Sequence, residues 1–220
     1  MITFKLKDVK YEFPTCWPDV TYAQYVALLK TPNNIIDYVA LFTGLDRAML
    51  ATAKLNGVEK IVVALSFLST PPQFEAGPTR MVGPYPMPKD ITLQSLGQFE
   101  DLRALIQQLP RKETKDYTID DHLTVAELYL SACAIYVQKV INGEYDPEQV
   151  ENVKLRLRIF SCIQVLQTGA FFFGRLLNTL TGTTTRSQKI TQRLKKLLLD
   201  FPGYRRSLDF LRPSSRKLSG

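Results

Sequence analysis

The residues best suited to chemistry in this chain are one histidine beside two carboxylates, together with three cysteines. His122 directly follows Asp120 and Asp121, and imidazole nitrogens with carboxylate oxygens can bind a metal ion. His122 is also the single histidine, so it is the one candidate base for a cysteine nucleophile. The same three residues lie just before Thr124, where a capping-box pattern predicts that a helix begins. We favour a polar lead-in to that helix and predict no metal site.

The cysteines do not form a pattern typical of catalysis or of a disulfide framework. Cys16, Cys133 and Cys162 are odd in number, widely spaced and set in apolar surroundings. Buried free thiols in a protein made in a reducing cytoplasm fit these features. The sequence contains no C-x-x-C, G-x-S-x-G or H-E-x-x-H motif and no glycine-rich phosphate loop. We therefore expect no catalytic residue and no cofactor, and we expect that the protein is not an enzyme.

Nearly all the net charge of the chain lies at its C-terminal end. Residues 186–220 contain ten Lys or Arg against two Asp, a net charge of +8. The whole chain has 28 basic and 21 acidic residues, so 18 and 19 remain for residues 1–185, a net charge of about −1. A basic segment on a near-neutral body is typical of an arm that binds an acidic partner, such as nucleic acid, a membrane surface or a neighbouring subunit.

Within this basic segment, apolar residues recur at helical spacing beside basic ones. The pattern predicts a basic amphipathic helix that ends at Pro202-Gly203. We predict that the segment binds its partner through Lys189, Arg193, Leu194, Lys196, Leu197, Phe201, Arg205, Arg206, Arg212, Arg216 and Lys217. The sequence leaves open whether that partner is protein, DNA or a membrane surface, or whether the segment is a solvated helix.

The length and composition indicate an ordinary folded protein. The chain has 220 residues, of which 45% are hydrophobic and 22% charged, enough to bury a core in one or two domains. The first residues lack the apolar stretch of a signal peptide, so we expect none. The most apolar stretch, residues 159–180, is interrupted by polar side chains, which favours a core helix and no membrane span.

The N-terminal region predicts a small hairpin followed by short helices. Residues 2–6 and 9–13 alternate apolar and polar positions, as strands do. Trp17 is predicted to anchor the hairpin to the helical segments after it, and Thr21 with Gln24 forms a capping box at a helix start. Further helices are predicted over residues 35–43, from 47 to near 57, and over 59–68.

A proline-rich stretch separates this region from the next. Six of the thirteen prolines fall within residues 71–88, and proline disfavours helix at its own position and at the preceding one. We expect an extended segment, either an irregular linker or an arm that lies against a partner.

The region after it predicts three helices. The first covers residues 95–109, and the second runs from the capping box at Thr124 and Glu127 to Asn142, ending at Gly143. The third begins at Asp146-Pro147 and continues to Gly182 as one long central helix, in which Gly169 and Gly174 allow close packing or a break.

These elements predict a mainly α fold with a small N-terminal β-hairpin, a Pro-rich extended arm and a basic helical C-terminal tail. The expected division is a hairpin with short helices over residues 1–70 and the Pro-rich arm or linker over 71–89. A helical region with the long central helix covers 90–182, and the basic arm occupies 183–220.

Several short patterns, in their order along the chain, resemble small proteins of tailed bacteriophages, in particular crAss-like and related gut phages. The patterns are Phe13-Pro14, Trp17, Asp19-Val20-Thr21 with Gln24-Tyr25, Leu41-Phe42-Thr43-Gly44, Ala134-Ile135-Tyr136, Gly143-Glu144-Tyr145 and Gly169-Ala170-Phe171-Phe172-Phe173. They touch most of residues 1–182 and leave the basic tail uncovered.

The resemblance implies a virion component near the neck or tail, or a tail-assembly factor, with no catalytic residue to transfer. We expect a non-enzymatic structural protein of the virion, a repeated ring subunit made in the host cytoplasm. Its partners would be copies of itself and neighbouring virion proteins, with DNA as a further partner of the tail and no small-molecule substrate. A tail-assembly chaperone and a basic nucleic-acid-binding module remain as alternatives.

Overall fold

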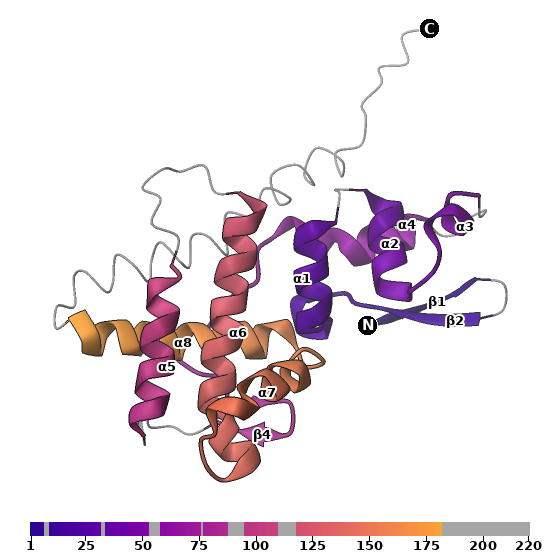
Figure 1. Ribbon diagram of the computed structural model, residues 1–220. Helices are drawn as coiled ribbons and strands as arrows, with labels where there is room; N and C mark the ends of the chain where they lie inside the picture. Colours follow the sequence, from indigo (N-terminus) through magenta and orange to yellow (C-terminus); the bar gives the residue numbers. More distant parts are fainter. Residues whose placement is uncertain are drawn as a thin grey trace, which may run out of the picture.

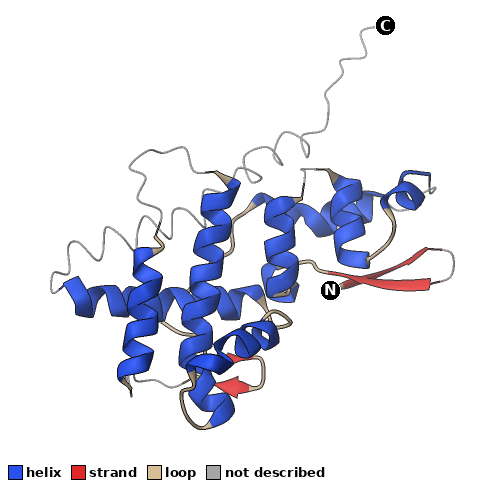
Figure 2. Ribbon diagram, in the orientation of Figure 1, coloured by secondary structure: helices blue, strands red, loops and turns tan. Residues whose placement is uncertain are grey.

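The protein is mainly helical, and its described part contains eight α-helices with a two-stranded hairpin at the N-terminus (Figures 1 and 2). The computed structural model describes residues 1–6, 9–31, 34–52, 58–75, 77–87, 95–109 and 118–181. The predicted fold class is confirmed for its helical character and its hairpin. The predicted basic helical tail, and with it residues 183–220, lies outside the described residues.

The N-terminal hairpin pairs β1 (Ile2–Leu6) with β2 (Val9–Phe13) in antiparallel register, with Ile2 opposite Phe13. Because side chains alternate between the faces of a sheet, Ile2, Val9, Tyr11 and Phe13 share one face. Phe13 is fully buried, and its ring packs edge-on against Phe42 at 5.2 Å. The hairpin is therefore anchored at its base, while its outer end projects from the helices (Figure 1).

Trp17 links this hairpin to two helical segments. It opens the 3₁₀ turn η1 (Trp17–Asp19), and its indole N–H donates to the Thr70 carbonyl at 2.8 Å. Its ring packs edge-on against Tyr25 and Phe67. Tyr25 belongs to α1 (Tyr22–Lys30), and Phe67 to η2 (Ser66–Ser69). The predicted anchoring role of Trp17 is confirmed.

The first helix begins where its capping box was predicted. The Thr21 hydroxyl accepts from the Gln24 N–H at 3.2 Å, and the Gln24 side chain accepts from the Thr21 N–H at 2.9 Å. Two further amides at this helix start donate to carbonyls far away in the sequence. Tyr22 N–H donates to Phe160 at 2.8 Å, and Ala23 N–H donates to Arg158 at 2.9 Å.

These two hydrogen bonds explain why one prediction is wrong. The long helix expected from Asp146 to Gly182 consists of η3 (Pro147–Gln149), α7 (Val150–Leu157) and α8 (Cys162–Thr181). The backbone leaves the helix between Leu157 and Cys162, so that its carbonyls face the amides of α1. Local sequence cannot reveal this break, because the partner amides lie more than 130 residues away. The helix continues through Gly169 and Gly174.

Three helices follow α1 beside the hairpin. α2 (Ile35–Thr43) is capped by Asn34 and ends at Gly44, whose φ of 70° is the left-handed conformation that favours glycine. α3 (Arg47–Thr52) starts after Asp46, and Arg47 pairs with Asp37 at 2.6 Å. α4 (Val58–Leu65) continues into η2, so the predicted helix 59–68 is α-helical only in its first part.

The proline-rich segment lies on α8 of the same chain. The described residues 71–75 and 77–87 contain no helix, only the short strands β3 (Met81–Val82) and β4 (Tyr85–Pro86). Val82 is fully buried, and the glutamine and threonine side chains of α8 bind this segment in four hydrogen bonds: Gly83 N–H to Gln164, Glu75 N–H to Gln167, Gln167 to the Gly77 carbonyl, and Thr79 with Thr168. One side of the predicted arm is therefore occupied within its own chain.

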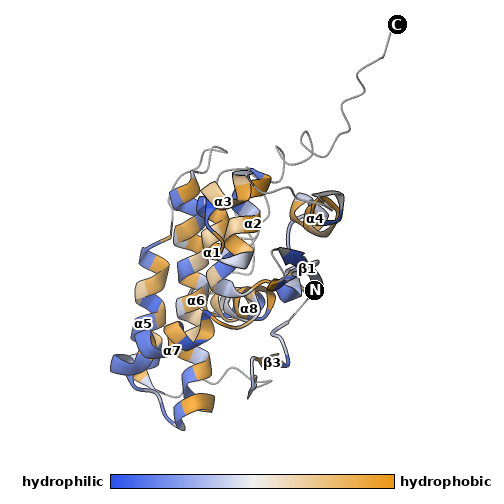
Figure 3. Ribbon diagram, turned by 90° about the vertical axis from the view of Figure 1, so that its right-hand side faces the viewer, coloured by the Kyte–Doolittle hydropathy of each residue, from blue (hydrophilic) through white to orange (hydrophobic). Residues whose placement is uncertain are grey.

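The core lies where α6 (Ile119–Asn142) crosses α8, with α5 (Leu96–Gln107) beside α6 (Figure 1). The crossing is close because Gly169 of α8 faces the α6 backbone. A Cβ atom at Gly169 would lie 2.1 Å from the Tyr129 carbonyl oxygen. Around this point Tyr136 stacks on Phe172 with ring centroids 3.8 Å apart. Figure 3 shows hydrophobic residues along both helices where they meet.

The start of α6 differs from the prediction. The Thr118 hydroxyl accepts from the Asp121 N–H, and the Asp121 carboxylate accepts from the Thr118 N–H, so the capping box is Thr118 with Asp121. Thr124 lies inside the helix and donates to the Asp120 carbonyl. Both sequences match the capping pattern, and the earlier start places Asp121 and His122 at buried positions of the helix. The end at Asn142 and Gly143 is confirmed.

One helix of the described part meets the length and composition criteria for crossing a membrane. It is α6, and 72% of its apolar window is buried inside the protein. The core helix of a soluble protein meets the same criteria.

Candidate interaction surface

The eleven predicted partner-binding residues, at positions 189 to 217, lie outside the described residues. The candidate sites that the structure describes are therefore on the helical body.

The Asp120–His122 cluster is part of the first turns of α6 and does not precede the helix. Asp121 is largely buried and its carboxylate binds Thr118, while His122 is only 1% exposed. The prediction of a polar lead-in is wrong, because α6 begins at Ile119. In the part of the chain that the structure describes, no group of three or more His, Cys, Asp or Glu residues is placed to hold a metal ion.

The cysteines divide into two environments. Cys133 and Cys162 are buried, and burial raises the pKa of both thiols, so they remain protonated near neutral pH. Cys16 is exposed, so its predicted burial is wrong: the neighbouring Phe13 and Trp17 take the inward positions instead. Cys133 and His122 share α6 but lie eleven positions apart, about 16 Å along the axis. These two residues do not form a nucleophile–base pair.

A charged cluster joins α6 to α7. The Lys154 ammonium is 2.5 Å from Glu127 and 2.9 Å from Glu151, and Arg158 lies 3.8 Å from Glu127. Burial lowers the pKa of Lys154, but its hydrogen bonds to the two carboxylates outweigh this, so the pKa is raised. Because the partners compensate each other's charge, the cluster fixes α7 in place.

The exposed side of α7 and of the turn after it is unusually apolar. Leu155 is 62% exposed and Ile159 is 70% exposed, while Val153 and Leu157 are buried against the body. Leu155 lies on α7, and Ile159 lies in the turn directly after it, four positions further along the chain. Together with Glu148 of η3 and Glu151, which also pairs with Lys154, they form a surface that we call the α7 face.

Exposed apolar side chains elsewhere in the described residues are more scattered. Val63 on α4 and Leu96 on α5 are 71% and 76% exposed and stand singly. Single exposed apolar residues are common on protein surfaces, whereas adjacent pairs mark interaction sites more often. Sequence reasoning missed the α7 face. Its signal was that Leu155 and Ile159 are out of phase with Val150, Val153 and Leu157 in the apolar pattern.

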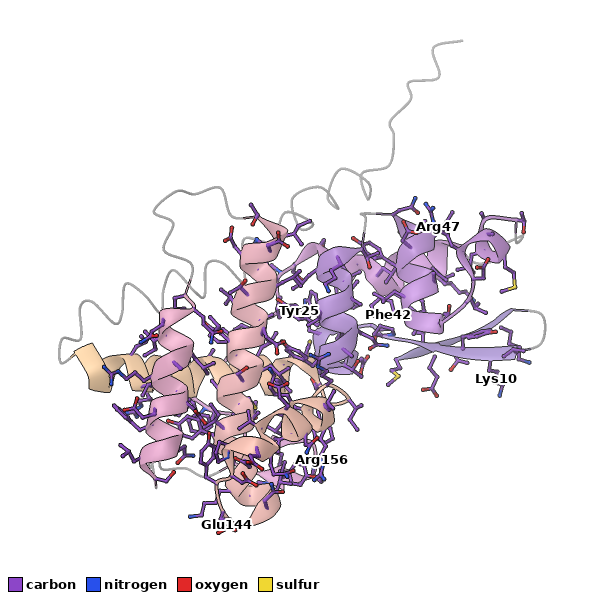
Figure 4. The ribbon with its side chains drawn as sticks, in the orientation of Figure 1. Lys10, Tyr25, Phe42, Arg47, Glu144 and Arg156 are labelled. Atoms are coloured by element: carbon purple, nitrogen blue, oxygen red, sulfur yellow. The ribbon has the colours of Figure 1, made fainter. Side chains whose placement is uncertain are left out.

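The projecting hairpin is a second exposed surface. Lys5 lies directly opposite Lys10 on its polar face, and Val9 at the outer end is 51% exposed. Like charges opposite each other destabilise a strand pair, so this arrangement is unfavourable for the isolated hairpin. Figure 4 shows Lys10 on the hairpin, well away from Glu144 and Arg156, which lie beside η3 and on α7.

Comparison with known proteins gives no match: no protein-family model, no curated protein and no solved structure is similar to this chain. The described geometry and the sequence patterns are therefore the basis for the function.

Proposed function

We propose that the protein is a non-enzymatic structural subunit of a tailed phage particle, repeated in a ring at the neck or tail. The phage part of the proposal depends on the ordered sequence patterns. The oligomeric part depends on one observation, the pair of large apolar side chains on the α7 face. Leu155 on α7 and Ile159 in the turn after it are more than 60% exposed, while ion pairs to Glu127 hold α7 against α6.

Such a subunit would be made in the host cytoplasm and end in the virion. Its partners would be copies of itself and neighbouring virion proteins, without a membrane span, a small-molecule substrate or a cofactor. The basic C-terminal segment favours two alternatives. A tail-assembly chaperone would also expose apolar residues, but would act only in the host. A nucleic-acid-binding module would use the +8 segment to neutralise phosphates.

Mass spectrometry of purified particles separates these functions. A ring subunit is expected in the particle at a fixed copy number. Its absence from particles, with normal abundance in infected cells, would contradict the proposal and favour the chaperone. Binding of the full chain to random duplex DNA, falling steeply between about 50 and 200 mM salt, would favour the nucleic-acid module.

A further inference from the structure

We infer that the α7 face binds the basic C-terminal segment, residues 186–201, of a second copy of this chain. This rests on the proposed ring subunit and names the contact that would join its copies. The contact is head-to-tail, because the segment and the face are different surfaces, and such contacts form rings when the rotation closes.

The α7 face offers apolar and acidic groups together. Leu155 on α7 and Ile159 in the turn after it are exposed, while Val153 and Leu157 are buried, and Glu148 of η3 and Glu151 precede them in the chain. Exposed apolar side chains beside carboxylates can bind a segment that carries apolar and basic residues. The two large apolar side chains supply the desolvated contact that binding requires, and the carboxylates lie at its η3 end.

The acidic end is a distinct feature of the sequence around it. Glu144, Asp146, Glu148 and Glu151 follow one another with no Lys or Arg between positions 140 and 153. Glu144 and Glu148 are exposed, and neither side chain forms an ion pair within the described residues. In Figure 4, Glu144 lies at the lower end of the molecule, near the start of this acidic stretch.

The C-terminal segment has the complementary pattern. Its predicted apolar stripe consists of Ile190, Leu194, Leu197, Leu198 and Phe201, and Lys189, Arg193 and Lys196 line the side of this stripe. The acidic stretch from Glu144 to Glu151 and the basic residues of the segment are opposite in charge, so the two surfaces attract each other.

The position of α8 favours a neighbouring copy over the same chain. α8 begins three positions after Ile159 and has twenty residues, so it carries the chain about 30 Å away before the segment begins. The four residues 182–185 that join α8 to the segment span at most about 14 Å when fully extended. This is shorter than α8, so the start of the segment cannot reach the start of α8 in the same chain, whereas a second copy imposes no such constraint.

Sedimentation of the full chain, with variants on the α7 face, tests the contact. Leu155→Asp and Ile159→Asp should each raise the dissociation constant for self-association about tenfold or more, because they place a charge in the apolar contact. Leu96→Asp is the matched control, since Leu96 is equally exposed but lies on α5. It should leave self-association unchanged. Melting curves of all three variants should match the parent, since none of these side chains is buried.

A charge exchange identifies the occupant. Glu144→Lys with Glu148→Lys in one chain, and Lys189→Glu with Arg193→Glu in another, should each lose self-association at low salt. A mixture of the two should associate again, because each face then meets a segment of opposite charge. This result supports the inference.

The other outcomes overturn it. If the parent chain sediments as a monomer, or if the mixture of the two charge variants stays monomeric, the segment binds its own chain or DNA instead of a second copy. Self-association that survives Leu155→Asp would place the contact elsewhere and leave the ring proposal standing. Only the absence of the protein from purified particles would remove the ring proposal itself.

Discussion

The α6–α8 crossing is densely packed, whereas the side chains at the outer end of the β1–β2 hairpin are largely exposed. At the crossing, Gly169 brings one backbone against another, and Tyr136 and Phe172 stack beside it. At the hairpin, Lys5 lies opposite Lys10 and Val9 is half exposed (Lys10 is labelled in Figure 4). At Gly169 the first region has no room for an added Cβ atom. The second carries an unfavourable charge pair that an acidic partner would relieve.

This difference indicates that the crossing stabilises the fold, whereas the exposed regions are suited to binding a partner. Folding energy comes mainly from dense burial around α6, because buried apolar groups dominate stability. The hairpin end and the α7 face contribute little to the free energy of folding, and their exposed side chains can contact partners. Mutations should therefore affect stability strongly in the first region and association in the others.

The largest effect is expected at the crossing itself. Gly169→Val should destabilise the protein by about 3 kcal/mol or more, because its Cβ would overlap the Tyr129 carbonyl and force the helices apart. Urea unfolding followed by circular dichroism measures the loss. Gly97→Ala is the matched control, since its Cβ would meet only the Tyr145 ring at 3.7 Å. It should change stability by less than about 1 kcal/mol. Equal effects at the two glycines would contradict the proposed close crossing.

A second test concerns the joint between the regions. Trp17→Ala should cost about 3–5 kcal/mol, because it removes a buried ring that contacts Tyr25 and Phe67. Thermal melting of the full chain measures it. Trp17→Phe keeps an aromatic ring at this position but loses the indole hydrogen bond to Thr70, so this variant should retain most of the stability. An unchanged melting temperature for Trp17→Ala would mean that the hairpin is not anchored through this residue.

The smallest effect is expected on the hairpin. Lys10→Glu should raise stability by about 0.2–1 kcal/mol, since it converts a repulsive cross-strand pair with Lys5 into an attractive one. Lys10→Gln, which removes the repulsion alone, should fall between the parent and Lys10→Glu. The gain should shrink at high salt because exposed charges are screened. Destabilisation by both variants would show that Lys10 makes a favourable contact in the folded protein.

Elements with strong local signals could be predicted from the sequence. Thr21 with Gln24 marked the start of α1, and Gly44 and Gly143 marked the ends of α2 and α6. In each case the stabilising group lies within a few residues of the helix end, so the pattern contains the cause. The two strands were equally clear, because their alternation of apolar and polar residues is local.

Errors arose where the cause is distant or where two local patterns compete. The break between α7 and α8 depends on amides of α1, which no pattern around Phe160 reveals. Thr118 and Thr124 both match the start of a capped helix, and the earlier start also buries Asp121 and His122 in the body. The exposure of Cys16 likewise depends on which neighbours face the core.

The candidate site shows the same limit. The basic segment was visible as charge, but its docking surface was not, because Leu155 and Ile159 look like core residues of an uninterrupted helix. Only after the helix is divided at Arg158 do they lie on an exposed face. At 3.6 residues per turn, Leu155 and Ile159 are out of phase with Val153 and Leu157, and this difference was the available signal.

The bonds from Tyr22 and Ala23 to the carbonyls of Phe160 and Arg158 also impose an order of events during synthesis. At about 5–20 residues per second, Phe160 is added roughly 7–28 s after Tyr22. Until then, the first turn of α1 has only its capping box, and its remaining amides must bind water. The N-terminal unit therefore emerges from the ribosome long before it can close, and its apolar surface is open to chaperones for that interval.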